Sequence, residues 1–212
     1  MPALSRDPAT PRLESAIRST LAPLLREDGF SGSGRTYRRV RDGWVQIVGV
    51  QGSRYGGAFA VNLAIHPLAI PDLTGKMPAP RTMKMEHCEF RRRLSETACD
   101  QWWKHEATLA SMTIAMEAAA EVYARTGRAL LARVSGVDMP LMTVTAAEFI
   151  AGAYDFAGFS STKVRMALAL ARLRKSQGRL EESKAFAAWG LENASNAEFL
   201  RRELESVWNT RL

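Results

Sequence analysis

The stretch GWVQIVGVQGSRYGGAFAVNLAIHP, residues 43–67, contains two apolar segments separated by the glycine-rich GSRYGG. Side chains of alternating character in residues 44–51 and 58–65 predict two β-strands. Gln51 and Asn62 are polar residues inside these strands. Each is either a partner in internal hydrogen bonds or part of a binding site, and the strands alone do not decide between the two.

The sheet is expected to extend on both sides of this stretch. Asp42-Gly43 suits a tight turn with positive φ, so residues 35–41 are predicted to pair with the following strand as a hairpin. The alternating KMEHCEFRRRL, residues 84–94, predicts a fourth strand. Strands that follow one another in sequence usually pair, so we expect a four-stranded, mostly antiparallel sheet.

Helical periodicity replaces the alternation outside this region. Residues 12–30 are expected to form a helix that Pro23 kinks or breaks and that ends at Gly29. Residues 106–125 predict a helix with an apolar stripe at Leu109, Met112, Met116, Ala120 and Tyr123. Thr145 and Glu148 have the spacing of a capping box.

The C-terminal part is expected to be helical throughout. Two helices joined at Gly178 resemble a tetratricopeptide-type hairpin, with small residues where the helices would touch. A repeat array needs about three copies to bury its faces, so the single hairpin is expected to pack on the main domain or on another subunit. The predicted organisation is an α+β fold with a flexible tail at 1–12, an α+β domain at 13–142 and a helical extension at 143–212.

The composition is that of a basic protein, and it is typical of a cytoplasmic one. The 212 residues carry a net charge of +7, which favours polyanionic partners such as nucleic acid or acidic proteins. Two cysteines are too few for a disulfide framework. We expect no signal peptide, no membrane span and a cytoplasmic location.

A polar group on the sheet is the first candidate site. Gln51, Ser53 and Asn62 would form a polar spot on a face of small residues, with Arg54 at its rim. An amide can bind a base edge or a peptide backbone. The alternative is that these amides satisfy one another and the backbone of the GSRYGG loop, as buried polar groups usually do.

Arginines and aromatic residues form the second candidate site. Arg38, Arg92 and Arg93 lie on predicted strands near aromatic residues, and Trp102 follows the fourth strand. Arginine beside aromatic rings is typical of platforms for single-stranded nucleic acid. The alternative is a solvated strand face whose charges protect a sheet edge.

Metal and catalytic sites receive little support from the sequence. His87, Cys88, Cys99 and His105 lack the close ligand pairs of structural zinc sites, so we expect no metal and assign Cys88 to the core. No P-loop, nucleophile elbow or HExxH is present. We assign no catalytic residue and no cofactor. The sequence favours a protein that is not an enzyme, and an enzyme without a recognisable motif stays open as a third hypothesis.

The arrangement of these elements resembles the bacterial domain-of-unknown-function family 4304, over residues 13–140. The residues that carry the resemblance are Gln51, Ser53, Phe59, Val61, Asn62, Leu63, Cys88, Arg93, Leu94, Trp102 and Trp103. The resemblance implies an α+β fold and a bacterial cytosolic setting, and it implies no chemistry.

Two functions follow as hypotheses. The first is a non-catalytic protein that binds another macromolecule, either a partner protein or a second copy of itself, through the uncovered face of the helical hairpin. By analogy, such a protein would fit an accessory role in immunity or defence. The second is a nucleic-acid-binding or processing protein that uses the arginine-aromatic strands.

Overall fold

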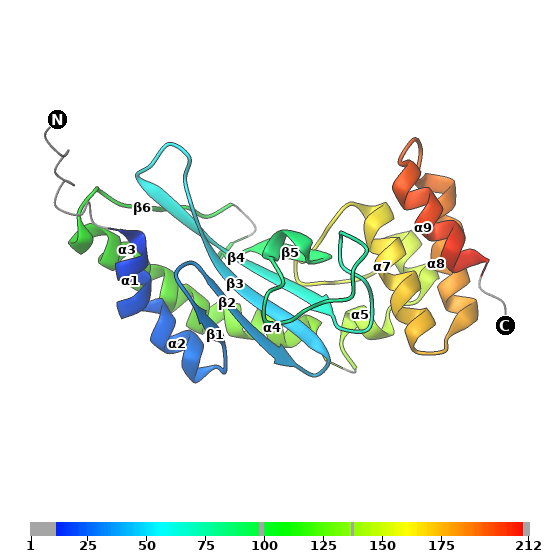
Figure 1. The fold of residues 1–212 in the computed structure, drawn as a ribbon, viewed down its shortest axis with the longest axis horizontal. Coiled ribbons are helices and arrows are strands. Elements are labelled where there is room, and N and C mark those ends of the chain that lie inside the picture. Colours follow the sequence, from blue (N-terminus) through cyan, green and yellow to red (C-terminus); the bar gives the residue numbers. More distant parts are fainter. Residues whose placement is uncertain (1–11, 98–99, 137, 210–212) are drawn as a thin grey trace, which may run out of the picture. The chain divides into compact units, whose positions relative to one another are not determined.

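The computed structural model describes residues 12–97, 100–136 and 138–209. The prediction of a flexible tail before Arg12 lies outside the described residues, and so does every prediction that concerns Cys99. The elements form an α+β fold, as predicted (Figure 1). The chain divides into two compact units, each built from three separate segments. Unit 1 comprises the described part of Met1–Arg39, with Val48–Asn62 and Arg93–Arg128, and unit 2 comprises Val40–Ile47, Leu63–Arg92 and the described part of Ala129–Leu212.

The sheet is antiparallel and has six strands, where the sequence predicted four. The strands are β1 (Ser31–Ser33), β2 (Thr36–Arg41), β3 (Trp44–Gly52), β4 (Ala58–Pro67), β5 (Phe90–Arg93) and β6 (Trp103–Lys104). Their order is β1-β2-β3-β4-β5, and β6 pairs with β4 beside this series. The two additional strands are short, and β6 depends on a distant partner because Trp103 lies opposite Phe59.

Local turn chemistry explains where several strands and helices end. Asp42 and Gly43 have φ angles of 51° and 79°, which gives the tight turn predicted between β2 and β3. The fourth predicted strand is too long: Met85–His87 form a 3₁₀ turn, η1, and β5 begins only at Phe90. Thr145 and Glu148 form the predicted capping box at the start of α6.

In the described part of the chain, two helices precede the strands in the sequence, and the other helices follow them. They are α1 (Leu13–Ser19), α2 (Leu21–Glu27), α3 (Leu109–Val122), α4 (Arg128–Val134), α5 (Pro140–Thr143), α6 (Ala146–Ala151), α7 (Lys163–Ser176), α8 (Leu180–Asn193) and α9 (Glu198–Trp208). A π-helical turn, η2 (Tyr123–Gly127), follows α3 directly. The predicted first helix is broken into α1 and α2 at Thr20, and Gly29 with φ of 83° follows its end.

In unit 1, α1 and α2 pack on α3, and α3 contacts β6 (Figure 1). Ile17 and Leu21 are fully buried in α1 and α2, and Met112 and Met116 are buried in α3. The predicted stripe on α3 is therefore confirmed at its methionines, whereas Leu109 at its start is exposed. Since Ala115 and Ala119 are also buried, the core face of α3 is wider than the predicted stripe and includes the neighbouring positions.

In unit 2, three helices pack together. The predicted pair α7 and α8 is joined at Gly178, which has a φ of 75°. Helix α9 contacts both members of this pair (Figure 1). Ser183 of α8 donates a hydrogen bond to the Ala171 carbonyl of α7 at 2.7 Å, a close approach that the small residues permit. The pair is thus not a lone hairpin, and the likeness to a tetratricopeptide repeat stays a prediction.

A second part of the unit 2 core is formed by residues of β3 and β4 and of the segment before β5. It comprises Val45, Ile47, Ala64, Met83 and Cys88. Cys88 is fully buried there, which confirms its assignment to the core. Among the described residues, no helix is both long and apolar enough to cross a membrane.

Candidate functional site

The two polar residues of the central strands form a direct pair in unit 1. Gln51 is the penultimate residue of β3 and is exposed, and Asn62 lies half-buried within β4. The Asn62 Nδ2 donates to the Gln51 Oε1 at 3.1 Å. Neighbouring strands of the sheet therefore satisfy one amide with the other, as the internal alternative expected.

Arg93, the last residue of β5, contacts both amides. Its Nε donates to Asn62 Oδ1 at 3.3 Å, and its Nη2 donates to Gln51 Oε1 at 3.4 Å. Its Nη1 lies 3.0 Å from the carboxylate of Asp100. A planar guanidinium has donors in several fixed directions, so one side chain can link three acceptors on three segments.

Trp102 completes this group of residues. The Arg93 guanidinium carbon lies 4.5 Å from the centroid of the Trp102 ring, and the Trp102 Nε1 donates to Asp100 Oδ2 at 3.1 Å. We call Gln51, Asn62, Arg93, Asp100 and Trp102 the amide-arginine cluster. It brings together four of the eight predicted site residues, and whether they bind a ligand stays a prediction.

Two further predicted residues lie in the loop between β3 and β4. The Ser53 hydroxyl accepts a hydrogen bond from the Tyr55 amide at 3.1 Å. The Arg54 guanidinium carbon lies 4.5 Å from the Tyr55 ring centroid, and its Nη2 donates to the Tyr55 hydroxyl. Tyr55 is 82% exposed, so the loop presents an arginine and an aromatic ring to solvent.

The last two predicted residues belong to different units. Arg38 is half-buried on β2 in unit 1, where its carbonyl accepts from the Ser31 hydroxyl at 3.4 Å. Arg92 is in unit 2, and its Nη1 donates to the Ala157 carbonyl. Burial lowers the pKa of Arg92 from its ordinary value. The Arg92 guanidinium thus has a structural partner within its own unit.

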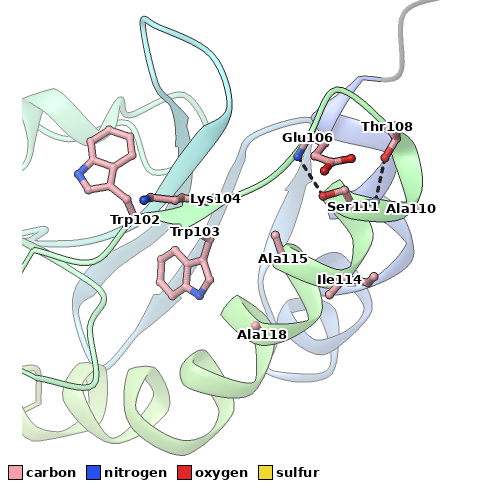
Figure 2. Close-up of a pocket in the computed structure, with 10 residues that line it drawn as sticks. All are labelled: Trp102, Trp103, Lys104, Glu106, Thr108, Ala110, Ser111, Ile114, Ala115 and Ala118. Atoms are coloured by element: carbon pink, nitrogen blue, oxygen red, sulfur yellow. Dashed lines mark hydrogen bonds between the residues drawn. The ribbon is translucent and has the colours of Figure 1, made fainter.

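A groove that the sequence did not predict lies between β6 and α3 in unit 1 (Figure 2). It has a volume of about 690 Å³ and is lined mainly by aromatic, aliphatic and small side chains. The lining residues are Trp102, Trp103, Lys104, Glu106, Thr108, Ala110, Ser111, Ile114, Ala115 and Ala118. We call it the β6–α3 groove.

Helix α3 forms one wall of this groove. Ala110, Ile114 and Ala118 recur every four residues, so they lie along one side of the helix (Figure 2). Ile114 is 67% exposed, although isoleucine is usually buried. The sequence carried a signal for this wall, because Ile114 lies off the apolar stripe formed by Met112 and Met116.

Strand β6 forms the opposite wall. Trp103 is buried and stacks on Phe59 with ring centroids 5.7 Å apart, while Trp102 is 38% exposed. In the described part of the chain, β6 pairs with β4 and with no second strand. The His105 amide donates to the Gly57 carbonyl at 2.9 Å, and Lys104 pairs with Ala58 at the next position. Antiparallel pairs alternate, so the backbone amide and carbonyl of Lys104 point away from β4.

Metal-binding geometry is not found among the described residues: no three histidine, cysteine or acidic side chains are grouped to hold an ion. His87 ends the 3₁₀ turn η1 and Cys88 follows it, so both residues precede β5. His105 instead contacts the Glu106 carbonyl through its Nδ1 at 2.8 Å.

Comparison with known proteins gives a family match. The model of the family described as Domain of unknown function (DUF4304) matches residues 21–125. Searches of curated proteins and of solved structures return no match. Residues 21–125 therefore match the DUF4304 family, within the range 13–140 over which the sequence resembles it.

Proposed function

We propose that this protein is a non-catalytic binding protein that holds an extended segment of a partner protein in the β6–α3 groove. The observation that carries the proposal is the open edge of β6 beside an apolar groove within one unit. An extended peptide can add to such an edge through its backbone and place alternate side chains in the groove.

Exposed apolar side chains supply the driving force for this binding. Ile114 and Trp102 both lie at the groove, and both leave a large part of their surface in water. Covering apolar surface is favourable by about 25 cal/mol per Å² before the costs of association are subtracted. Tryptophan at a groove is also a frequent centre of binding energy.

Charge favours an acidic partner. The chain has a net charge of +7, and Lys104 extends from β6 at the groove (Figure 2). No ion pair of Lys104 occurs among the described residues. A peptide with aspartate or glutamate opposite Lys104 would be favoured in encounter rate and in specificity.

The groove replaces the surface on which the sequence-based hypothesis depended. That hypothesis required an uncovered face on a lone C-terminal hairpin, and α9 packs on both helices of that pair. Because α9 contacts both helices, an uncovered face on this pair no longer supports the hypothesis of self-association. A role in immunity or defence, and a bacterial cytoplasmic setting, stay predictions.

The test uses a photo-cross-linking amino acid at Ile114, with Ile150 as the matched control. Ile150 is an exposed isoleucine in unit 2. We expect a defined protein adduct from position 114 in cells and none from position 150. The acidic segment of that partner, made as a synthetic peptide, should bind the wild type and the Ile150→Glu variant but bind Ile114→Glu at least about tenfold more weakly. Equal affinities of the two variants would refute the groove.

The second candidate function is nucleic-acid binding, favoured by the exposed Arg54–Tyr55 pair. A free aromatic face beside a guanidinium can stack on an unpaired base. The protein, treated with nuclease, would be titrated with single- and double-stranded DNA and RNA over a salt series. Binding with a log–log slope of about −0.7 to −0.9 per phosphate contact, lost in Tyr55→Ala, would support this function. The double variant Arg38→Ala with Arg92→Ala tests the predicted platform in the same assay.

A further inference from the structure

In unit 2, β5 is joined to the segment that leads into α7. The amide of Arg91 donates to the Ser160 carbonyl at 3.2 Å, and the Ser160 amide donates to the Arg91 carbonyl at 3.1 Å. On the preceding residue, the Phe90 ring meets Phe156 edge to face at 6.2 Å. We call this contact the β5–α7 joint.

Glu89 lies at the joint, immediately before β5, and is only 3% exposed. Its Oε2 is 4.0 Å from the Nε of Arg165 on α7, beyond hydrogen-bond distance. Both atoms are buried, and neither has a hydrogen-bond partner among the described residues. A buried carboxyl oxygen and a buried guanidinium nitrogen are thus both left without a hydrogen bond, which is costly for each group.

The charged groups around Glu89 come from three segments of the chain. Arg165 and Arg172 are on α7, Arg91 is on β5, and Asp72 follows β4. Arg172 is already paired with Glu203 of α9 at 2.5 Å. The Asp72 carboxylate accepts from the amides of Thr74 and Lys76, and its other oxygen is 3.6 Å from His87.

His66 on β4 contacts Glu89 but carries no charge into the joint. Its Nδ1 accepts from the Glu89 amide at 3.3 Å, so its Nε2 holds the proton and donates to the Ile70 carbonyl at 3.1 Å. Arg165 is thus the positively charged group nearest to the Glu89 carboxylate, at 4.0 Å. At this distance its attraction offsets only part of the free-energy cost of burying an ionised carboxylate.

We propose that Glu89 is a proton-operated clamp: in its protonated form it allows β5 to stay closed on the segment before α7, and loss of the proton loosens this joint. The contact geometry leaves the ionised carboxylate without a hydrogen bond at Oε2, while opening the joint would return it to water. Proton release and opening are therefore coupled. This inference concerns unit 2 and does not depend on the groove of unit 1.

The direction of the pH effect follows from the same burial. Desolvation raises the pKa of Glu89 from 4.5 to about 7, against the lowering effect of the arginines. An acid whose pKa is higher in the closed state stabilises that state fully below about pH 4.5. This stabilisation decreases as the pH rises and is lost above about pH 7.

The experiment compares the wild type, Glu89→Gln and the control Glu86→Gln. Glu86 is an exposed glutamate in the same segment. Carboxyl ¹³C signals and the amide signals of Arg91 and Ser160 would be followed by NMR between about pH 4 and pH 8.5. This range includes the ordinary glutamate pKa of 4.5 and the raised Glu89 pKa of about 7. We expect the Glu89 carboxyl to titrate at least about one pH unit above the ordinary glutamate value of 4.5, and the Arg91 and Ser160 amides to report the same midpoint.

Denaturant unfolding measures the coupling. Relative to Glu89→Gln, the unfolding equilibrium constant of the wild type should rise by up to about tenfold per pH unit between about pH 5 and pH 7. Glu86→Gln should keep the wild-type profile. A Glu89 titration midpoint at the ordinary glutamate value of 4.5, or identical pH profiles in the wild type and Glu89→Gln, would overturn the clamp.

Arg165→Gln tests the partner and protects the conclusion if Glu89→Gln fails to fold. Removal of the nearest cation should move the Glu89 titration to higher pH, because Arg165 is the main group that favours its ionised form. An unchanged titration midpoint in Arg165→Gln would show that the two residues are not coupled and would also overturn the proposal.

Discussion

At the scale of single residues, His66 has a role that its position in the sequence does not reveal. It is fully buried, and both ring nitrogens are engaged, one with the Glu89 amide and one with the Ile70 carbonyl. These bonds fix one neutral tautomer, since one nitrogen accepts and the other donates. His66 therefore links β4 to two neighbouring segments and is not free to act as a base for Cys88.

The pH dependence of this residue gives a prediction opposite in sign to that of Glu89. Burial lowers the pKa of His66 from 6.5 to about 4. The unfolded chain thus binds a proton first, and we expect stability to fall by up to about 1.4 kcal/mol per pH unit as the pH decreases from 6.5 towards 4. Proton-coupled nitrogen NMR of the ring should show neutral His66 with its proton on Nε2 at about pH 5.5, between these two values. A charged ring at that pH would contradict this tautomer.

Asn62 answers the structural side of the question that the central strands raised. Its side chain donates to Gln51 and accepts from Arg93, so both ends of the amide are used. We expect Asn62→Ala to lower the free energy of unfolding by about 1–2 kcal/mol, since two hydrogen bonds are lost at a half-buried site. Urea unfolding measures this, with the exposed Gln51→Ala as the milder control. Unchanged stability together with lost partner binding would instead make Asn62 a binding residue.

At the scale of elements, local sequence signals were sufficient where one or two residues set the geometry. The Asp42–Gly43 turn and the Thr145–Glu148 cap are examples, because their requirements are met within four residues. Alternation failed at residues 84–89, since a 3₁₀ turn has no alternating face and still places Cys88 in the core. Strand β6 could not be predicted locally, because it exists through pairing with a strand far away in sequence.

The π-helical turn η2 gives a prediction at this scale. A Cβ atom at Gly127 would lie 2.6 Å from Cδ2 of Tyr123. The Tyr123 ring cannot move away freely, because it is fully buried and its hydroxyl donates to Asp28 Oδ2 at 2.8 Å. We expect Gly127→Ala to cost about 1–3 kcal/mol of stability by overpacking, measured by denaturant unfolding.

Gly52→Ala is the control for this substitution. A Cβ atom there would meet only the guanidinium of Arg35, with Nη1 at 3.1 Å and Cζ at 3.9 Å, which is the end of a flexible and exposed side chain. We expect a loss of less than about 1 kcal/mol. Similar losses in the two variants would mean that the close contact with Tyr123 does not define the turn.

At the scale of the whole molecule, the division of the chain differs from a simple order along the sequence. Each compact unit draws on three segments, and β2, β3 and β4 each contribute residues to both. The predicted boundary at residue 142 divides the chain by its order along the sequence, and such a division does not sense which distant segments pack together. The sequence did place Gln51, Asn62, Arg93 and Trp102 among the site residues. It missed α3 as the wall of the groove, because the packing of α3 beside β6 cannot be inferred from the local sequence.

A shortened chain tests whether residues 13–142 form an independent domain. In unit 2 the segment Leu63–Arg92 packs with residues beyond 142, through Arg91 with Ser160 and Phe90 with Phe156. Removal of residues 143–212 exposes buried aromatic surface, so we expect a loss of at least about 3 kcal/mol and displaced amide signals at Phe90 and Arg91. Addition of a separately expressed fragment 143–212 should restore these signals. If the fragment 1–142 keeps the Phe90 and Arg91 signals of the full chain and unfolds at the same denaturant concentration, the domain boundary read from the sequence is correct and the helical extension is dispensable for this part of the fold.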